Sequence, residues 1–142
     1  MTGGYTFVGG GSTNLIALGT VDGKTFFADD TIGVWAISVK FCADRGMRIA
    51  AITSKAQWDL LLAAYDALKF TADHWIAARD SHKSRQFTWD GLTSQPNQTY
   101  GVWTNEHKIN YQTCACINPD PIHRAIHFDL CTNVHRTLCE TK

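Results

Sequence analysis

The sequence predicts an α+β domain in which two helices precede a small antiparallel sheet. Apolar side chains recur at helical spacing in the first half of the chain, and from Trp75 onward they fall in short extended runs. The length of 142 residues fits one domain that buries a substantial core. We therefore expect one domain over residues 22–142, preceded by a glycine-rich arm over residues 1–21.

The arm carries several glycines, including a run of three at residues 9–11, around a short apolar patch. This composition is typical of a flexible segment. Residues 24–28 then favour a strand, because they combine β-branched and aromatic side chains. We expect that strand to end at the acidic turn Asp29-Asp30.

The first predicted helix is indicated by Trp35, Val39 and Cys42, which lie four and three residues apart. Gly46 is placed to end this helix. The spacing puts the three apolar side chains on one face. We therefore expect Cys42 to point into the core.

The second predicted helix runs from about residue 54 to 68 after a short apolar run. Ser54 and Gln57 form a capping box, in which each side chain satisfies a free backbone amide. An apolar stripe follows at helical spacing, formed by Trp58, Leu61, Leu62, Tyr65 and Leu68. We interpret the stripe as core packing and not as a cofactor site.

The rest of the chain is divided into short runs with strand character. We expect strands at residues 75–78, 86–89, 111–117, 125–128 and 136–139. Residues 91–110 form a long segment without a regular pattern. Long segments of this kind in compact domains are usually either functional or disordered.

The charge pattern excludes some partners. Thirteen basic and thirteen acidic side chains balance, so no net field attracts nucleic acid or an anionic membrane. No stretch approaches the roughly 18 consecutive apolar residues of a membrane span. The first residues lack a signal pattern, so the chain is either intracellular or the mature form of a secreted protein. No nucleophile elbow, paired carboxylates or cofactor fingerprint indicates an enzyme.

The five cysteines favour secretion. They do not form two Cys-x-x-Cys pairs, so a zinc knuckle is not expected. Cys42 lies far upstream of the other four, as expected if a long-loop disulfide, worth roughly 4 kcal/mol, ties a C-terminal strand to an early element. Asn97 begins an Asn-Gln-Thr acceptor for N-glycosylation, which also favours secretion.

Three histidines lie close together in the sequence, namely His123, His127 and His135. Three imidazoles can hold zinc. The segment between them has a proline-rich break and strand character, so the spacing of the first two is not helical. We therefore interpret them as surface histidines.

The order of several short motifs resembles a C-type lectin-like domain over residues 22–140. The motifs follow Trp35, Cys42 and Gly46 and are HWIAARD (74–80), FTWDG (87–91), YGVW (100–103), CACI (114–117), FDLC (128–131) and LCE (138–140). Their joint order is far more specific than any one motif. The resemblance implies the C-type lectin-like fold, with two helices, small antiparallel sheets and a long irregular loop region stapled by disulfides.

The resemblance also implies two disulfides, one between Cys42 and Cys139 and one between Cys114 and Cys131. Cys116 is then a free cysteine. It lies two residues after Cys114 on the same strand face, so it competes with Cys114 for Cys131. The leftover thiol is either buried and inert or links to a second chain as a homo-oligomer.

In sugar-binding members of the family, a calcium ion is held by a proline-containing triplet after the loop tryptophan and by acids before two cysteines. Here Lys108 brings an ammonium to the triplet, which has no proline, and an ammonium repels the ion. Glu106 and Asp129 are the remaining charged candidate metal ligands. The full set of ligand-binding candidates is Asn105, Glu106, Lys108, Asn110, Gln112 and Asp129. We therefore expect no cofactor and no retained calcium.

A second triplet, Gln95-Pro96-Asn97, resembles a galactose-type motif. It precedes Trp103, whereas the triplet of the family follows that tryptophan. It also contains the glycosylation acceptor. We interpret residues 92–99 as an exposed polar insertion.

Lectin-like domains that lose calcium commonly bind proteins, which is an analogy at the level of the fold. We therefore expect a secreted recognition domain that binds a protein or glycan without calcium, through residues 92–112 with 118–129. The alternative is a calcium-dependent carbohydrate-binding lectin of innate-immune type. Its degenerate site would use Glu106, Asn110 and Asp129, with Trp103 or Tyr100 stacked on a sugar.

Overall fold

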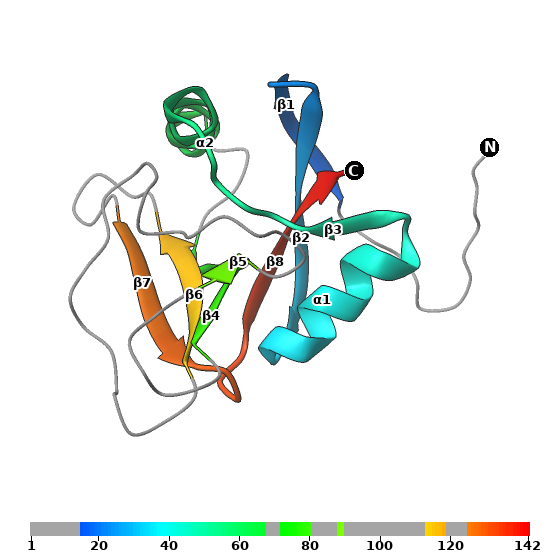
Figure 1. Cartoon of the computed structure of the whole chain (residues 1–142), viewed down its shortest axis with the longest axis vertical. Helices are drawn as coiled ribbons and strands as arrows, with labels where there is room; N and C mark the ends of the chain where they lie inside the picture. Colours follow the sequence, from blue (N-terminus) through cyan, green and yellow to red (C-terminus); the bar gives the residue numbers. More distant parts are fainter. Residues whose placement is uncertain (1–14, 68–71, 81–87, 90–112, 119–124) are drawn as a thin grey trace.

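The computed structural model of the chain describes residues 15–67, 72–80, 88–89, 113–118 and 125–142. Its elements follow one another as shown in Figure 1. They are β1 (Ile16–Val21), β2 (Lys24–Gly33), α1 (Trp35–Asp44), β3 (Met47–Ile49), α2 (Lys55–Asp66), β4 (His74–Asp80), β5 (Thr88–Trp89), β6 (Thr113–Asn118), β7 (Ala125–Leu130) and β8 (His135–Thr141). Two helices followed by a strand-rich second half confirm the predicted fold class.

The strands of the described residues form one sheet in the order β1-β2-β8-β4-β6-β7, with β3 paired to β8 and β5 to β4. The C-terminal strand β8 therefore lies in the middle of the sheet, between the two halves of the chain. The β4–β8 pair is parallel, unlike the other pairs of this sheet. A parallel pair needs a long connection, and the chain between β4 and β8 is long enough because it also supplies β6 and β7.

Part of the segment that we assigned to the arm is a strand of the sheet. Residues 16–21 form β1, which pairs with β2 from Val21↔Lys24 outward. The turn between them is Asp22-Gly23, and both residues have positive φ, 55° and 79°. Asp-Gly with this geometry is a typical two-residue hairpin turn.

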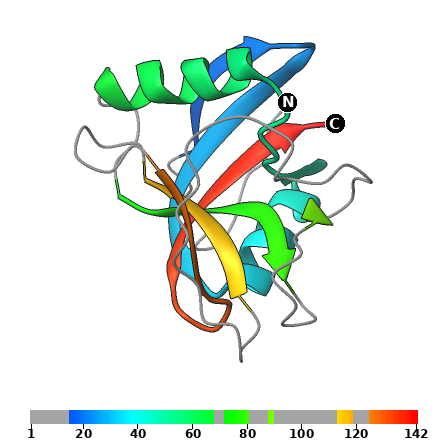
Figure 2. The same cartoon turned by 60° about the vertical axis from the view of Figure 1, so that its left-hand side comes forward.

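The helix α2 packs against β1, as Figure 2 shows, and Gly19 of β1 lies at this contact. Its φ is +146°, a backbone conformation that side chains disfavour. A Cβ at Gly19 would lie 2.9 Å from Leu60 Cδ1. The glycine therefore permits the close approach of helix and strand.

The strand predicted at residues 24–28 also continues further than expected. β2 passes through Asp29 and Asp30 and ends at Gly33, with an irregular register between Asp29 and Gly33. Asp29 is buried, and its Oδ2 accepts a hydrogen bond from the Thr31 amide at 2.8 Å. The Asp29 carboxylate thus accepts a hydrogen bond from a backbone amide in the irregular part of the strand. The strand therefore continues past the acidic pair and does not turn out to solvent there.

The helix α1 ends near Gly46, which has a φ of +74°, and Cys42 points into the core as predicted. At the start of α2, Ser54 Oγ accepts a hydrogen bond from the Gln57 amide at 3.2 Å. The return bond differs from a standard capping box, because Gln57 Oε1 accepts from the Thr53 amide at 2.8 Å. Trp58 and Leu61 are buried in the core.

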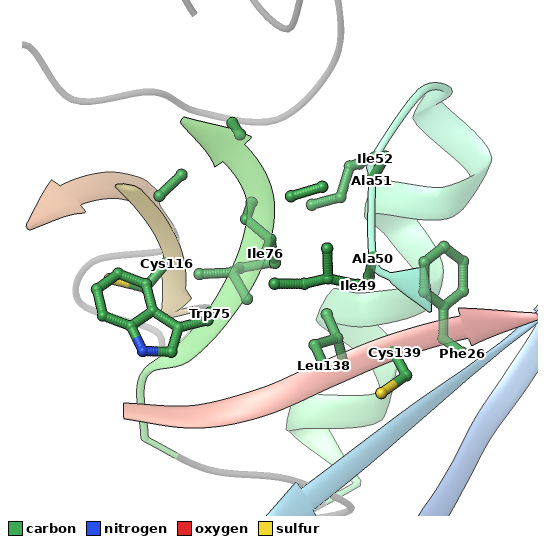
Figure 3. Packing of buried hydrophobic residues seen from close by; sticks show 14 of the residues in the cluster. Phe26, Ile49, Ala50, Ala51, Ile52, Trp75, Ile76, Cys116, Leu138 and Cys139 are labelled. Atoms are coloured by element: carbon green, nitrogen blue, oxygen red, sulfur yellow. The ribbon is translucent and has the colours of Figure 1, made fainter. Parts of the chain in front are cut away.

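The core lies between the helices and the sheet, and Figure 3 shows Ile49, Ile76 and Leu138 packed together inside it. Two tryptophans tie its parts together. Trp35 Nε1 of α1 donates to the Ile76 carbonyl of β4, and Trp75 Nε1 of β4 donates to the Gly33 carbonyl of β2, both at 2.9 Å. Within the described ranges, no helix is long and apolar enough to cross a membrane.

Candidate functional site

Most of the predicted ligand surface lies outside the described residues. This is true of the glycosylation acceptor Asn97 and of the candidates Asn105, Glu106, Lys108, Asn110 and Gln112. The candidate that the structure describes is Asp129 on β7. Its surroundings therefore carry the structural argument about the calcium site.

Both oxygens of Asp129 already accept hydrogen bonds. Oδ1 accepts from the Leu130 amide at 2.8 Å and from Asn133 Nδ2 at 2.7 Å. Oδ2 accepts from His135 Nε2 at 2.8 Å. Burial alone would raise the pKa of Asp129, but these hydrogen bonds, that of His135 first, outweigh burial and hold the pKa below its usual value. The carboxylate is therefore ionised and engaged within the protein.

His135 leads from Asp129 to a group of four side chains, Asp73, Cys116, His127 and His135, which we call the polar cluster. Asp73 directly precedes β4, and His135 is the first residue of β8. The parallel pairing of β4 with β8 brings these two together. Cys116 on β6 and His127 on β7 are partners in the antiparallel ladder. Adjacent strands thus place residues from four parts of the sequence side by side.

The distances within the polar cluster are short. His127 Nε2 lies 3.6 Å from Cys116 Sγ and 3.4 Å from Asp73 Oδ2. His135 Nδ1 lies 3.8 Å from Asp73 Oδ2. Donor atoms of Asp73, Cys116 and His135 all lie within 4.8 Å of one another. Three potential metal-ligating atoms therefore converge on one small volume, and His127 Nε2 lies beside two of them.

Two members of the polar cluster, Asp73 and Cys116, have shifted pKa values. Burial would raise the pKa of Asp73, but hydrogen bonding and charge from His127, with help from His135 and Asn118, keep this pKa below its usual value. The second oxygen, Asp73 Oδ1, is buried and has no hydrogen-bond partner. Burial, together with the charges of Asp73 and Asp129, raises the pKa of the Cys116 thiol well above its usual value.

The disulfides lie on either side of the sheet's centre. Cys42 of α1 is joined to Cys139 of β8, and Cys114 of β6 is joined to Cys131 just after β7. This is the pairing that the resemblance implies. Cys116 is left as a thiol that is 0% exposed. A sulfur enclosed in this way cannot reach a second chain in the folded structure.

The interpretation of the histidines as surface residues was wrong for two of them. The side chains of His127 and His135 are 28% and 17% exposed, and both contact Asp73. His123 lies outside the described residues. The sequence held a usable signal: Ile126 and Phe128 are buried, so His127 and Asp129 must share the other face of β7.

An open hollow of about 390 Å³ borders the polar cluster. Asp73, His135 and Arg136 line it, together with the exposed apolar side chains Ile32 and Val134. Solvent and small ions therefore have a route to the edge of the cluster.

Comparisons with known proteins identify the fold and the family. The sequence model of the family described as Lectin C-type domain matches residues 33–141. The snaclec bitiscetin subunit alpha of Bitis arietans is 37% identical over 101 residues, covering 63% of this chain and 77% of that protein.

Among solved structures, human lithostathine is similar with a TM-score of 0.73 at 13% identity, covering 92% of this chain and 96% of that one. The carbohydrate-recognition domain of the mouse scavenger receptor C-type lectin is similar with a TM-score of 0.70 at 16% identity, covering 89% and 95%. These two likenesses show the fold alone. The extent of the sequence match shows that the chain belongs to the C-type lectin domain family.

Proposed function

We propose that this chain is a secreted recognition domain that binds a protein through its long-loop surface, residues 92–112 with 118–129, without a bridging calcium ion. Members of the family are binding proteins, and this chain carries two disulfides, a feature of oxidising compartments outside the cytosol. The proposal concerns which ligand the surface takes and whether a metal is needed.

The proposal that no calcium ion is needed rests on the hydrogen bonds that Asp129 already accepts. Calcium requires six to eight oxygen ligands, several of them carboxylates. The sequence offers Glu106 and Asp129 as charged ligands, and Asp129 already accepts three hydrogen bonds from Leu130, Asn133 and His135. An ion bound to Asp129 would compete with those donors for its lone pairs.

The protein-binding part is supported by the relative from Bitis arietans, whose name describes it as one subunit of an assembly. It is also supported by Lys108, because a loop ammonium suits an acidic partner surface better than a calcium ion.

Calcium titration by calorimetry tests the metal requirement directly. We expect no site of micromolar affinity in the intact chain, and no change on Glu106→Gln. A micromolar site that Glu106→Gln abolishes would overturn the calcium-free reading.

A panel of secreted and cell-surface proteins, probed with the intact chain, tests the ligand class. Lys108→Glu should weaken binding to a panel member by about tenfold or more. The matched control is Lys40→Glu on α1, where the lysine side chain is 71% exposed. This substitution should leave binding unchanged. Equal effects of the two variants would place the binding surface elsewhere.

The second candidate is calcium-dependent sugar binding through Glu106, Asn110 and Asp129. It is favoured by one observation, namely that the mouse structure with the same fold is titled a carbohydrate-recognition domain. A glycan array run with and without a chelator separates the two. Chelator-sensitive signals would favour this second candidate, and silence on the array supports the protein ligand.

A further inference from the structure

The polar cluster has the composition of a zinc site. It brings together one carboxylate, one thiol and two imidazoles, which are the ligand types that bind Zn²⁺ in proteins. Structural zinc is almost always held by four such ligands in a tetrahedron. The cluster supplies four, and they come from Asp73, Cys116, His127 and His135.

The spacing of the ligand atoms also fits a tetrahedron. With zinc–nitrogen and zinc–oxygen bonds near 2.1 Å and a zinc–sulfur bond near 2.3 Å, tetrahedral angles place N and O ligands about 3.4 Å apart and S and N ligands about 3.6 Å apart. His127 Nε2 lies 3.4 Å from Asp73 Oδ2 and 3.6 Å from Cys116 Sγ. His135 Nδ1 is 3.8 Å from Asp73 Oδ2, and its mutual group within 4.8 Å holds Asp73 and Cys116 but not His127, so the two imidazoles would move towards each other when an ion binds.

The surroundings orient His135 as a metal ligand. Its Nε2 lies 2.8 Å from Asp129 Oδ2, and a hydrogen bond donated there by Nε2–H makes Nδ1, which lies on the side of Asp73, the nitrogen available to a metal ion. A histidine that donates its other ring nitrogen to a carboxylate is a recurring feature of zinc sites. Asp129 is itself fixed by Leu130 and Asn133. The rings of His135 and Trp75 also pack in a T-shaped arrangement, with ring centroids 4.6 Å apart.

The cluster also contains groups that a cation would satisfy. Asp73 Oδ1 is buried without a partner, and Cys116 is a fully buried thiol beside two carboxylates, Asp73 and Asp129. Figure 3 shows Cys116 on β6 next to Trp75 on β4, inside the packed part of the sheet. A divalent ion bound by one thiolate and one carboxylate would be neutral as a unit, which suits such a site. The hollow beside Asp73 and His135 provides the entry path.

We propose that Asp73, Cys116, His127 and His135 bind one Zn²⁺ ion, with Asp129 holding His135 in the ligating orientation. Binding forms a zinc–sulfur bond and releases the Cys116 proton to solvent, with no change in oxidation state. The ion would join the ends of β4 and β8 to the β6–β7 ladder. His127 and Asp129 also belong to the 118–129 part of the long-loop surface, but zinc content and binding to the protein panel are measured separately, so either proposal can fail alone.

The first experiment uses the intact, disulfide-bonded chain after metal removal with a chelator and without reductant. Zinc content after dialysis and competition with a chromophoric chelator give stoichiometry and affinity. We expect one zinc per chain and a dissociation constant below about 1 µM. With Co²⁺ in place of zinc, we expect the intense visible bands of a tetrahedral site and a thiolate-to-cobalt charge-transfer band.

Variants assign the ligands. Cys116→Ser should abolish the charge-transfer band and weaken zinc binding by about 100-fold or more, and Asp73→Asn should weaken binding with the band still present at high cobalt. Asp129→Asn, which removes the support of His135, should weaken binding by about 10- to 100-fold. The matched control is Asp44→Asn, which removes an exposed carboxylate on α1. This variant should bind zinc as tightly as the chain without substitutions.

Zinc should also raise the thermal unfolding midpoint of the unchanged chain but not that of Cys116→Ser. Less than about 0.1 zinc per folded, unchanged chain would overturn the proposal, and this result does not depend on whether any variant folds. A cobalt complex without a charge-transfer band, or a Cys116→Ser chain with unchanged affinity, would overturn it as well.

Discussion

Two carboxylates in this molecule, one buried and one half-buried, have opposite surroundings. Glu140 near the end of β8 accepts from Lys24 Nζ at 2.6 Å, Arg48 Nε at 2.7 Å and the Ala51 amide at 2.8 Å. Asp73, at the other end of the β4–β8 pair, faces imidazoles and a thiol and keeps one oxygen without a partner. The first site carries its own cations. The second is composed of ligand atoms, and this difference is what distinguishes a structural ion pair from a candidate metal site.

Each of the two regions that hold these carboxylates also contains one disulfide. Removing the disulfides should cause the largest losses in the free energy of unfolding. Cys42–Cys139 spans 97 residues of sequence and Cys114–Cys131 spans 17. The chain-entropy model gives losses of about 4.7 and about 3 kcal/mol for the two double Cys→Ser variants. Urea unfolding without reductant measures both. A larger loss for the shorter loop would show that native packing, and not chain entropy, sets the order.

The carboxylates should differ when each is neutralised. Glu140→Gln leaves Lys24 and Arg48 beside a buried neutral amide, and breaking a buried pair in this way costs about 3 to 5 kcal/mol. Asp73→Asn in chelator-treated protein should change the free energy of unfolding by no more than about 1 kcal/mol, because its partners are imidazoles.

Chemical denaturation at pH 7.5 measures both changes, with the exposed Asp44→Asn as a control. Equal losses at Glu140 and Asp73 would remove the distinction between the two sites.

His74, at the start of β4, gives a smaller and pH-dependent effect. Burial lowers the pKa of His74 to about 4 from its ordinary value of 6.5. Between these values the unfolded chain binds the proton and the folded chain does not, so stability falls as the pH is lowered from about 6.5 towards about 4. From pH 7.5 to pH 5, His74 should contribute a loss of about 2 kcal/mol.

Urea unfolding at both pH values, compared between the unchanged chain and His74→Gln, isolates this contribution. The variant should lose less stability on acidification. Parallel pH profiles would mean that His74 is protonated alike in the folded and unfolded chains.

The elements that the sequence predicted best are those with a strong local pattern. The stripes of α1 and α2 and the motif order of the second half were sufficient for the fold class. β1 was missed because nearby glycines suggested an arm, although Asp22-Gly23 is itself a hairpin signal. Asp29 was taken for a turn because its burial depends on β8, which lies more than 100 residues away.

The polar cluster could not be predicted from the sequence for a similar reason. His127 and His135 were weighed with His123 as one local group, but their contacts are set by strand register. The residue opposite His127 is Cys116, and the residue beside His135 is Asp73. Neither neighbour can be found from spacing alone, because each depends on which strands pair.

The hydrogen bonds of the Trp35 and Trp75 indoles connect the helical first half of the chain with its strand-rich second half. Trp35 of the helical half donates to a β4 carbonyl, and Trp75 of β4 donates back to a β2 carbonyl. Separating the halves would therefore leave orphaned polar groups on both sides at once. Amide hydrogen exchange should accordingly find one cooperative unit across α1, β2 and β4, with no subglobal opening that frees one half while the other stays folded.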